Sequence, residues 1–368
     1  MKNPIIYDET KKFVAKGYGA SGNLIGGKTL HPVEVERFQP KADEVLIEIM
    51  YCGVCHSDLH QVNNDWKNTI YSCVPGHEII GKVIEIGMEV SAFYLDDIVG
   101  VGCMVDSCQN CRSCMNGEEQ YCLGPVAQTM TYNGYFKPDG SNYNTFGGFS
   151  THIVVKDSFV LRIPKTLKYS NAAPILCAGV TTYSPLKHWG IKEGDSVGII
   201  GIGGLGHMSV MIAKAMGAKV TAITTKEEKR QAAHELGADF ILISEDEEAM
   251  KASETTFDFL LCTIPYSFDI APYVDLLAPR GRTIVTVGLL GPYKSATNNM
   301  EVAKYGRSIA GSIIGGIAET QEVLDFCAEH NILPHVEIID IKDINRAFEK
   351  LKDEEVRFRY VVDMNSLK

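Results

Sequence analysis

The spacing of apolar residues changes along the chain. In the first half, β-branched runs at 45–50 and 79–86 predict strands, and the Asn-, Gly- and Tyr-rich stretch 131–148 predicts a long loop. From residue 196 onward, strand-like and helix-like runs alternate regularly. We expect strands at 196–200, 219–224, 239–243, 257–263 and 283–287, and helices at 205–216 and 227–236. This alternation is typical of βαβ units in a parallel sheet.

The C-terminal part of the chain alternates less regularly. Helical patterns at 319–329 and 344–351 precede a strand pattern at 357–363. A chain of 368 residues is two to three times as long as a common domain of about 100–150 residues. With 45% hydrophobic and 22% charged residues, the composition is that of an ordinary globular protein. We therefore expect two domains, each with a sizeable core.

Charge and cysteine content exclude several classes of protein. The formal net charge of −11 offers no basic surface for nucleic acid. No apolar run approaches the roughly 18 residues that span a bilayer, and residues 1–13 lack the apolar core of a secretory signal. The 11 cysteines are too few, and odd in number, for a disulfide scaffold. We therefore expect a protein of the reducing cytoplasm, with no nucleic-acid or membrane partner.

Four closely spaced cysteines are the strongest indication of a metal site in the sequence. They have the spacing C-x2-C-x2-C-x7-C and are Cys108, Cys111, Cys114 and Cys122. Four thiolates this close in sequence can surround one tetrahedral zinc ion and leave no position for a substrate. An iron–sulfur cluster is the first alternative, and reduced surface thiols without metal are the second. We favour a structural zinc site, and we place Cys103 near it without assigning it a ligand role.

A second set of metal-binding residue types is dispersed along the chain. It comprises Cys55, the pair His77-Glu78, and Cys177 about a hundred residues later. Each of these residues, taken alone, is more often a structural residue than a metal ligand. Together they supply the two thiolates and one imidazole that hold zinc with one open position, as catalytic zinc sites do. Asp58 is the nearest carboxylate that can bind the second ring nitrogen of a ligating histidine.

A glycine-rich motif follows the strand predicted at 196–200 and opens the next helix. Its residues are Gly201, Gly203, Gly204, Leu205 and Gly206. Glycines at this place allow a tight turn and a close approach of the backbone to the pyrophosphate of a dinucleotide. In a strand–turn–helix context the motif predicts a dinucleotide site, and a simple Gly-rich turn is the alternative.

The end of the next predicted strand favours NADP(H) over NAD(H). An NAD site usually has an acidic residue there, about twenty residues after the glycines. This chain instead has hydroxyl and ammonium groups, which can bind a 2′-phosphate, at Thr224, Thr225, Lys226 and Lys229. Glu227 and Glu228 complicate the pattern, and we interpret them as acidic residues that favour a helix N-terminus.

The order of these motifs resembles that of the zinc-dependent medium-chain alcohol dehydrogenases over nearly the whole chain. Within that superfamily, the segments CGVCHSDLH, LDFCAEHNI and VRFRYVVD resemble the cinnamyl alcohol dehydrogenase branch. The resemblance implies an α/β protein with a mainly β GroES-like catalytic domain at 1–166 that resumes at 306–368. A Rossmann domain with a doubly wound parallel sheet, at 167–305, would be inserted between the two parts. It also implies a homodimer.

The resemblance assigns roles to individual residues. Cys55, His77 and Cys177 match the ligands of the catalytic zinc, and Glu78 matches an acid that can exchange onto the metal. Ser57 and His60 match a proton relay between the cofactor ribose and solvent. By family position alone, cofactor contacts fall on Thr181, Val287, Gly288 and Ser312. The expected cofactors are NADP(H) and two zinc ions per chain, one catalytic and one structural.

The implied reaction is the interconversion of primary alcohols and aldehydes. Plant enzymes of the branch carry a tryptophan shortly before a Tyr-Asn pair, whereas here Met130 precedes Thr131 and the pair Tyr132-Asn133. A flexible methionine adapts to varied apolar shapes, which favours broad reduction of aromatic, allylic or aliphatic aldehydes. The alternatives are an NADPH-dependent iminium or enal reductase and a non-enzymatic NADPH-binding zinc protein.

Overall fold

The computed structural model describes residues 11–22, 29–124, 128–134, 144–288, 293–294, 298–352 and 359–368. The chain folds into two compact units. The first comprises Met1–Cys177 and Gly315–Lys368, and the second comprises Ala178–Ile314. The second unit is thus an insertion in the first. No helix in the described part of the chain is both long and apolar enough to cross a membrane.

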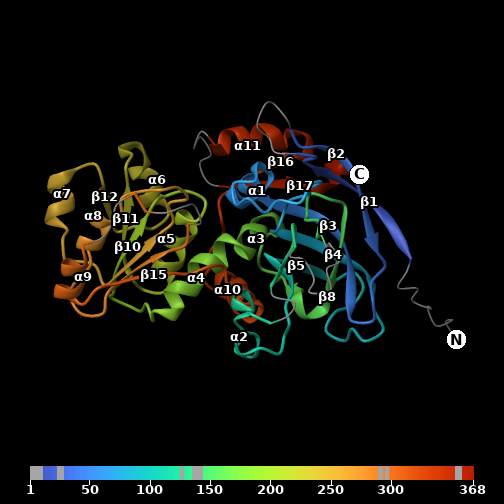
Figure 1. The fold of residues 1–368 in the computed structure, drawn as a ribbon, viewed down its shortest axis with the longest axis horizontal. Helices are drawn as coiled ribbons and strands as arrows, with labels where there is room; N and C mark the ends of the chain where they lie inside the picture. The colour runs from blue at the N-terminus through green and yellow to red at the C-terminus, as the bar shows by residue number, and fades with distance from the viewer. Residues whose placement is uncertain are drawn as a thin grey trace. The chain divides into compact units, whose positions relative to one another are not determined.

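The first unit is built mainly from β-strands (Figure 1). Its strands are β1 (Lys12–Gly19), β2 (His31–Phe38), β3 (Glu44–Val54), β4 (Ile79–Ile86), β5 (Ile98–Val101), β6 (Met104–Asp106), β7 (Thr129–Met130), β8 (His152–Lys156), β9 (Leu161–Arg162), β16 (Val336–Asp340) and β17 (Arg359–Asp363). Its α-helices are α1 (His56–Asn63), α2 (Arg112–Met115), α3 (Tyr169–Ala172), α10 (Ile317–Glu329) and α11 (Ile344–Lys352). Its 3-10 turns are η1 (Glu119–Tyr121), η2 (Asp157–Phe159), η3 (Ala173–Leu176), η5 (Ile341–Asp343) and η6 (Met364–Leu367).

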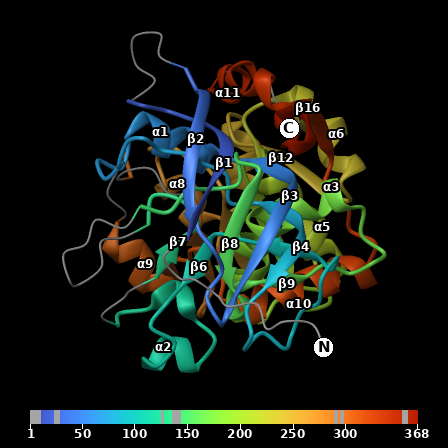
Figure 2. The ribbon, with the colours of Figure 1, turned by 90° about the vertical axis from the view of Figure 1, so that its right-hand side faces the viewer.

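Strand β3 organises the main sheet of this unit. The strand order is β16-β17-β3-β4-β5-β9, and β8 also pairs with β3. Figure 2 shows β8, β3 and β4 running side by side. Val45, Ile47 and Ile49 alternate along β3 and are fully buried, which is the period-2 pattern of a strand packed on a core. Because β17 also pairs with β3, the C-terminal strand completes the same sheet.

The second unit contains a parallel sheet flanked by helices. Its strands are β10 (Ser196–Ile200), β11 (Lys219–Thr224), β12 (Phe240–Ile243), β13 (Phe259–Cys262), β14 (Thr283–Thr286) and β15 (Ser308–Gly311). Its helices are α4 (Ala178–His188), α5 (Gly206–Ala215), η4 (Glu227–Lys229), α6 (Arg230–Glu235), α7 (Glu247–Ala252), α8 (Ala271–Asp275) and α9 (Asn299–Tyr305). The order β12-β11-β10-β13-β14-β15, with all pairs parallel, is the 3-2-1-4-5-6 order of the Rossmann fold.

The boundaries of the two compact units differ from the domain boundaries expected from the sequence. Residues 167–177 lie in the first unit and not in the Rossmann unit, because α3 and η3 pack on the strands of the first sheet. Residues 306–314 lie in the Rossmann unit and not in the returning catalytic domain, because β15 is the sixth strand of the parallel sheet.

The sequence pattern locates most of the Rossmann elements to within two residues. The helix expected at 227–236 begins instead with the 3-10 turn η4 and continues as the short α6. Strand β15 was not expected, because its four residues are partly or fully exposed and carry no apolar alternation. Of the loop expected at 131–148, residues 135–143 lie outside the described residues.

Candidate metal centres and nucleotide site

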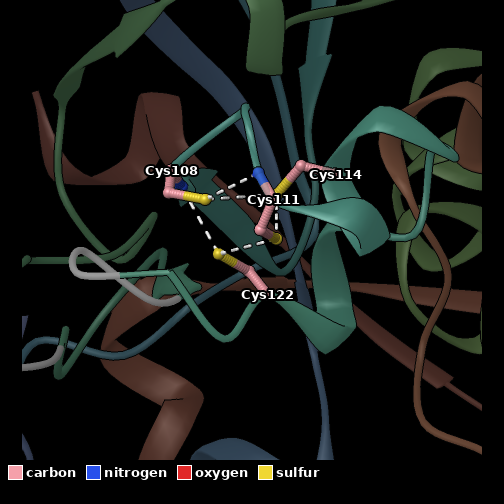
Figure 3. Close-up of side chains that lie close together, drawn as sticks. All are labelled: Cys108, Cys111, Cys114 and Cys122. Carbon is pink, nitrogen blue, oxygen red and sulfur yellow. Dashed lines mark hydrogen bonds between the residues drawn. The ribbon is translucent and has the colours of Figure 1, made fainter.

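The four-cysteine segment forms a compact cluster of sulfur atoms (Figure 3). The Sγ–Sγ distances are 3.5 Å for Cys111–Cys114, 3.9 Å for Cys108–Cys114 and 3.9 Å for Cys111–Cys122. A tetrahedral zinc ion with Zn–S distances of about 2.3 Å places its sulfur ligands about 3.8 Å apart. The cluster therefore fits one zinc ion closed by four sulfurs, whereas a disulfide would need sulfurs about 2.05 Å apart.

Backbone amides of the same segment lower the pKa of Cys108 and Cys111, whereas burial raises the pKa of Cys114 to about 12 and that of Cys122 above the ordinary thiol value. The amide of Cys111 donates to Sγ of Cys108 over 3.3 Å, and the amide of Cys108 donates to Sγ of Cys122 over 3.4 Å. Hydrogen bonds from the amides of Cys114 and Leu123 lower the pKa of Cys111 to about 6. Since metals bind thiolates and not thiols, Cys111 is prepared for a metal ion, and zinc would displace the protons of Cys114 and Cys122 on binding.

The dispersed ligand residues converge at one end of the first unit's sheet. Cys55 follows β3, His77 and Glu78 precede β4, and Cys177 follows η3. The pairing of β3 with β4 brings two of these segments together, because the amide of Gly53 donates to the carbonyl of Glu78 over 2.9 Å. Nε2 of His77 lies 3.2 Å from Sγ of Cys177. The donor atoms of all four side chains lie within 4.8 Å of one another, and all four residues are buried.

Asp58 fixes the orientation of His77. Its Oδ1 accepts from the amide of Gly76 over 2.9 Å and lies 3.1 Å from Nδ1 of His77. Its Oδ2 accepts from the amide of Cys55 over 2.8 Å. With Nδ1 held by this fully buried carboxylate, Nε2 faces Cys177 and is the nitrogen available to a metal. The ring of Tyr132 lies 5.4 Å from that of His77 between centroids and packs against it.

The electrostatics of this site favour a cation. A hydrogen bond with Cys177 and the charge of Arg359 hold the pKa of Cys55 well below the ordinary thiol value, against the opposing effect of burial. Burial alone would lower the pKa of His77, but the Asp58 carboxylate outweighs it and raises that pKa well above its ordinary value. The set therefore attracts positive charge strongly, and its residue types and spacing fit a zinc ion with three protein ligands.

Two buried residues near this set were not assigned to it from the sequence. Cys103 is buried, and a hydrogen bond joins its thiol to Cys177 of the catalytic set and lowers the pKa of Cys103. Arg359 contacts Oε1 of Glu78 in a buried ion pair. Neither residue lies near Cys55 or Glu78 in the sequence, so no spacing signal points to them.

The relay residues both lie on α1, which begins directly after Cys55. Sγ of Cys55 lies 3.7 Å from Oγ of Ser57. Nδ1 of His60 lies 2.7 Å from Oδ2 of Asp65, and the His60 ring packs against Trp66 with a centroid distance of 5.9 Å. Nε2 of His60 is buried and has no hydrogen-bond partner among the described residues. Asp65, which is exposed, connects His60 to the surface.

The glycine motif has the geometry of a phosphate-binding turn. Gly201 directly follows β10 and has a φ of +90°, a conformation that favours glycine. A Cβ on Gly206 would overlap the carbonyl oxygen of Gly201, whereas a Cβ on Gly203 would meet no atom within 4 Å. Gly203 thus borders open space at the start of α5, where Gly204 and Leu205 precede the helix. This turn and helix N-terminus fit a pyrophosphate.

The end of β11 supplies the polar groups expected for a 2′-phosphate. Thr224 ends the strand, and its Oγ1 accepts from the amide of Lys226 over 3.3 Å, with Thr225 exposed between them. Nζ of Lys229 donates to the carbonyl of Ile202 over 3.4 Å, which places this ammonium group over the glycine turn. Arg230 binds both carboxylate oxygens of Glu227, over 2.5 and 2.9 Å, so that acid faces an arginine of its own segment.

Most of the other expected cofactor residues follow strands of the same sheet. Val287 and Gly288 follow β14, and Ser312 follows β15. The carboxyl ends of parallel strands meet at one edge of a sheet, where open α/β sheets bind their ligands. These residues therefore share an edge with the glycine turn. Thr181 does not follow a strand; it lies on α4 and is buried.

Comparisons with known proteins agree with this geometry. Residues 41–165 match the alcohol dehydrogenase GroES-like domain, and residues 204–329 match the zinc-binding dehydrogenase family. Aldehyde reductase YahK of Escherichia coli strain K12 is 46% identical over 349 residues, which cover 95% of this chain and 98% of the relative. The chain belongs to the zinc-binding alcohol dehydrogenase family.

Two solved structures show how closely this alcohol dehydrogenase resembles the cinnamyl branch. The cinnamyl alcohol dehydrogenase SbCAD4 of Sorghum bicolor has a TM-score of 0.90 at 38% identity, covering 96% of this chain and 98% of that one. CAD from Helicobacter pylori, whose structure is a complex with NADP(H), has a TM-score of 0.88 at 37% identity, covering 96% of this chain and 99% of that one. The expected family and fold class are confirmed.

Proposed function

We propose that this alcohol dehydrogenase reduces aldehydes to primary alcohols, and catalyses the reverse oxidation, with NADP(H) and a catalytic zinc ion. The proposal is carried by the convergence of Cys55, His77 and Cys177, with Asp58 orienting the imidazole, in a buried set that fits zinc with an open position. It is supported by the similarity to an aldehyde reductase and to a CAD crystallised with NADP(H).

Zinc, the cofactor and the side chains of the protein each contribute a different part of the proposed reaction. Zinc, when bound, would polarise the substrate oxygen, and NADP(H), when bound, would supply or accept the hydride. The chain itself orients the ligands and moves the proton. Asp58 keeps His77 in one tautomer, and burial of Cys55 and Cys177 limits water around the site.

Proton transfer is assigned to Ser57 and His60. Ser57 lies next to Cys55 on the first turn of α1, and His60 lies one turn further with its Nδ1 on Asp65. An imidazole can both accept and donate a proton, which suits a group that lies between a buried site and solvent. We propose that Ser57 and His60 move the proton and that the exposed Asp65 links His60 to solvent. The cofactor ribose, when bound, would supply a hydroxyl group to this relay.

The preference for NADP(H), a second structural zinc ion and a homodimer are further parts of the proposal. Thr225, Lys226 and Lys229 offer hydroxyl and ammonium groups for a 2′-phosphate. The sulfur distances of the four-cysteine loop support the structural zinc. Strand β15 is an edge of the parallel sheet, and an edge strand can pair with a second copy of the chain.

The proposed function is tested by turnover with a panel of aldehydes. NADPH oxidation is measured with benzaldehyde, cinnamaldehyde and short aliphatic aldehydes, and the alcohols are identified as products. We expect reduction of several members of the panel, because adaptable Met130 fits varied apolar shapes. Absence of turnover with every aldehyde would contradict the proposal.

A further inference from the structure

A buried ion pair lies directly beside the catalytic ligand set. Arg359 begins β17, and its guanidinium contacts Oε1 of Glu78; the two side chains are 3% and 0% exposed. Strand β17 pairs antiparallel with β3, with Tyr360 opposite Val54. The next step of this register places Arg359 alongside Cys55. The strand pairing that completes the sheet therefore also delivers a cation to the metal ligands.

The Glu78 carboxylate has a second side that faces no partner. Its Oε2 is fully buried and has no hydrogen-bond partner among the described residues. A carboxylate oxygen of Glu78 lies within 4.8 Å of the donor atoms of Cys55, His77 and Cys177. A buried carboxylate without partners on one side is costly unless a cation or a donor completes it. Glu78 thus stands between the guanidinium and the position of the metal.

Gly53 provides the space that the carboxylate occupies. It lies on β3, and its amide donates to the carbonyl of Glu78 over 2.9 Å. A Cβ added to Gly53 would overlap Oε2 of Glu78 and would lie 2.9 Å from its Cβ. Any larger residue at position 53 would force the carboxylate to move. The backbone of β3 and the side chain of Arg359 therefore hold the carboxylate from two sides.

The balance of charge around the metal position explains why the Glu78 carboxylate is paired with Arg359. A zinc ion bound by two thiolates and a neutral imidazole is neutral, and it keeps a fourth position for the substrate oxygen. A free carboxylate this close would compete for that position and leave a net negative charge in a buried site. The guanidinium neutralises the carboxylate and removes this tendency.

We propose that Arg359 is a positioning residue that holds the Glu78 carboxylate away from the fourth position of the catalytic zinc, with Gly53 providing the space for the pair. This inference rests on the proposed function, because it assumes zinc at Cys55, His77 and Cys177. It assigns a role at the metal to the C-terminal strand, which contributes no metal ligand.

The test compares Arg359→Met with Arg359→Met/Glu78→Gln. In the single variant the freed carboxylate takes the fourth position, so we expect kcat/KM for benzaldehyde to fall about 10–100-fold. Release of the catalytic zinc to a chromogenic chelator should slow several-fold, because a fourth protein ligand is added. In the double variant both values should return to those of Glu78→Gln alone, since no carboxylate is left to bind the metal.

Two further variants separate this role from a purely structural one. Arg282→Met, which removes the arginine of a half-exposed ion pair with Asp258 in the second unit, is the matched control and should change neither value. Gly53→Ala should reproduce the slow zinc release of Arg359→Met, and it keeps the test valid if that variant does not fold.

The outcomes are distinguishable. Zinc release from folded Arg359→Met at the wild-type rate or faster would overturn the positioning role, as would a double variant as impaired as the single one. If the wild-type protein binds zinc but reduces no aldehyde, the proposed function fails, while the zinc-release measurement still decides the role of Arg359.

Discussion

Replacement of Asp58 by asparagine tests the orientation of the catalytic histidine. The carboxylate receives hydrogen bonds from the amides of Cys55 and Gly76 and lies 3.1 Å from Nδ1 of His77. An asparagine of the same shape has one oxygen and one NH2 group. In either orientation of the amide, the NH2 group faces an N–H group that it cannot satisfy, so at least one buried donor loses its acceptor.

The size of the effect follows from these contacts. One unsatisfied buried donor costs about 1–3 kcal/mol. The bond from Nδ1 of His77 also loses its charged acceptor, and loss of such a partner lowers metal affinity about 10–100-fold. We expect the affinity of the Asp58→Asn variant for its catalytic zinc to fall within that range, which corresponds to about 1.4–2.8 kcal/mol.

Competition with a metal chelator measures this affinity in the wild type and the variant. Zinc at the four-cysteine loop serves as an internal reference, because Asp58 makes no contact with it. The matched control is Asp65→Asn, which removes an exposed carboxylate from the same segment. A catalytic-zinc affinity of Asp58→Asn within about threefold of wild type would show that the carboxylate does not set the ligand geometry.

Three other predictions address the remaining sites. Lys229→Glu should lower kcat/KM for NADPH, relative to kcat/KM for NADH, by about tenfold or more, because a carboxylate repels a 2′-phosphate. The control is Lys219→Glu, which makes the same charge change at the start of β11. Near-wild-type use of NADPH by Lys229→Glu would refute the assignment. Cys111→Ser should lose the structural zinc at neutral pH and unfold at a lower temperature, because one thiolate ligand is removed, whereas Arg112→Ala should keep both the zinc and the wild-type unfolding temperature. His60→Ala should slow turnover and alter its pH dependence between about pH 6 and 9, and an unchanged profile would exclude the relay.

Local motifs in the sequence predicted those parts of the protein whose residues are close in sequence. The four cysteines lie within fifteen residues, and the glycine turn is fixed by one strand and one helix. The parallel sheet was also predictable, because its buried strands and amphipathic helices alternate at regular intervals. Here most consecutive strands are neighbours in the sheet, with β13 beside β10 as the exception.

Other features depend on strands that pair across the whole chain. The contact of Arg359 with Glu78 requires β17 to lie beside β3, which no local pattern encodes. Cys103 is close to the four-cysteine loop in the sequence, and its hydrogen bond with Cys177 is a contact that this closeness does not indicate. Resemblance to a family supplied the long-range assignment of Cys177, because its surroundings in the sequence resemble those of an ordinary core cysteine.

Zinc content and turnover of Cys177→Ser test the central claim most directly. Zinc per chain and aldehyde-dependent NADPH oxidation are measured on the same samples of wild type and variant. The account predicts two zinc ions and turnover in the wild type, and one zinc ion, a retained fold and no turnover in the variant. A Cys177→Ser protein that keeps both zinc ions and full turnover would contradict it.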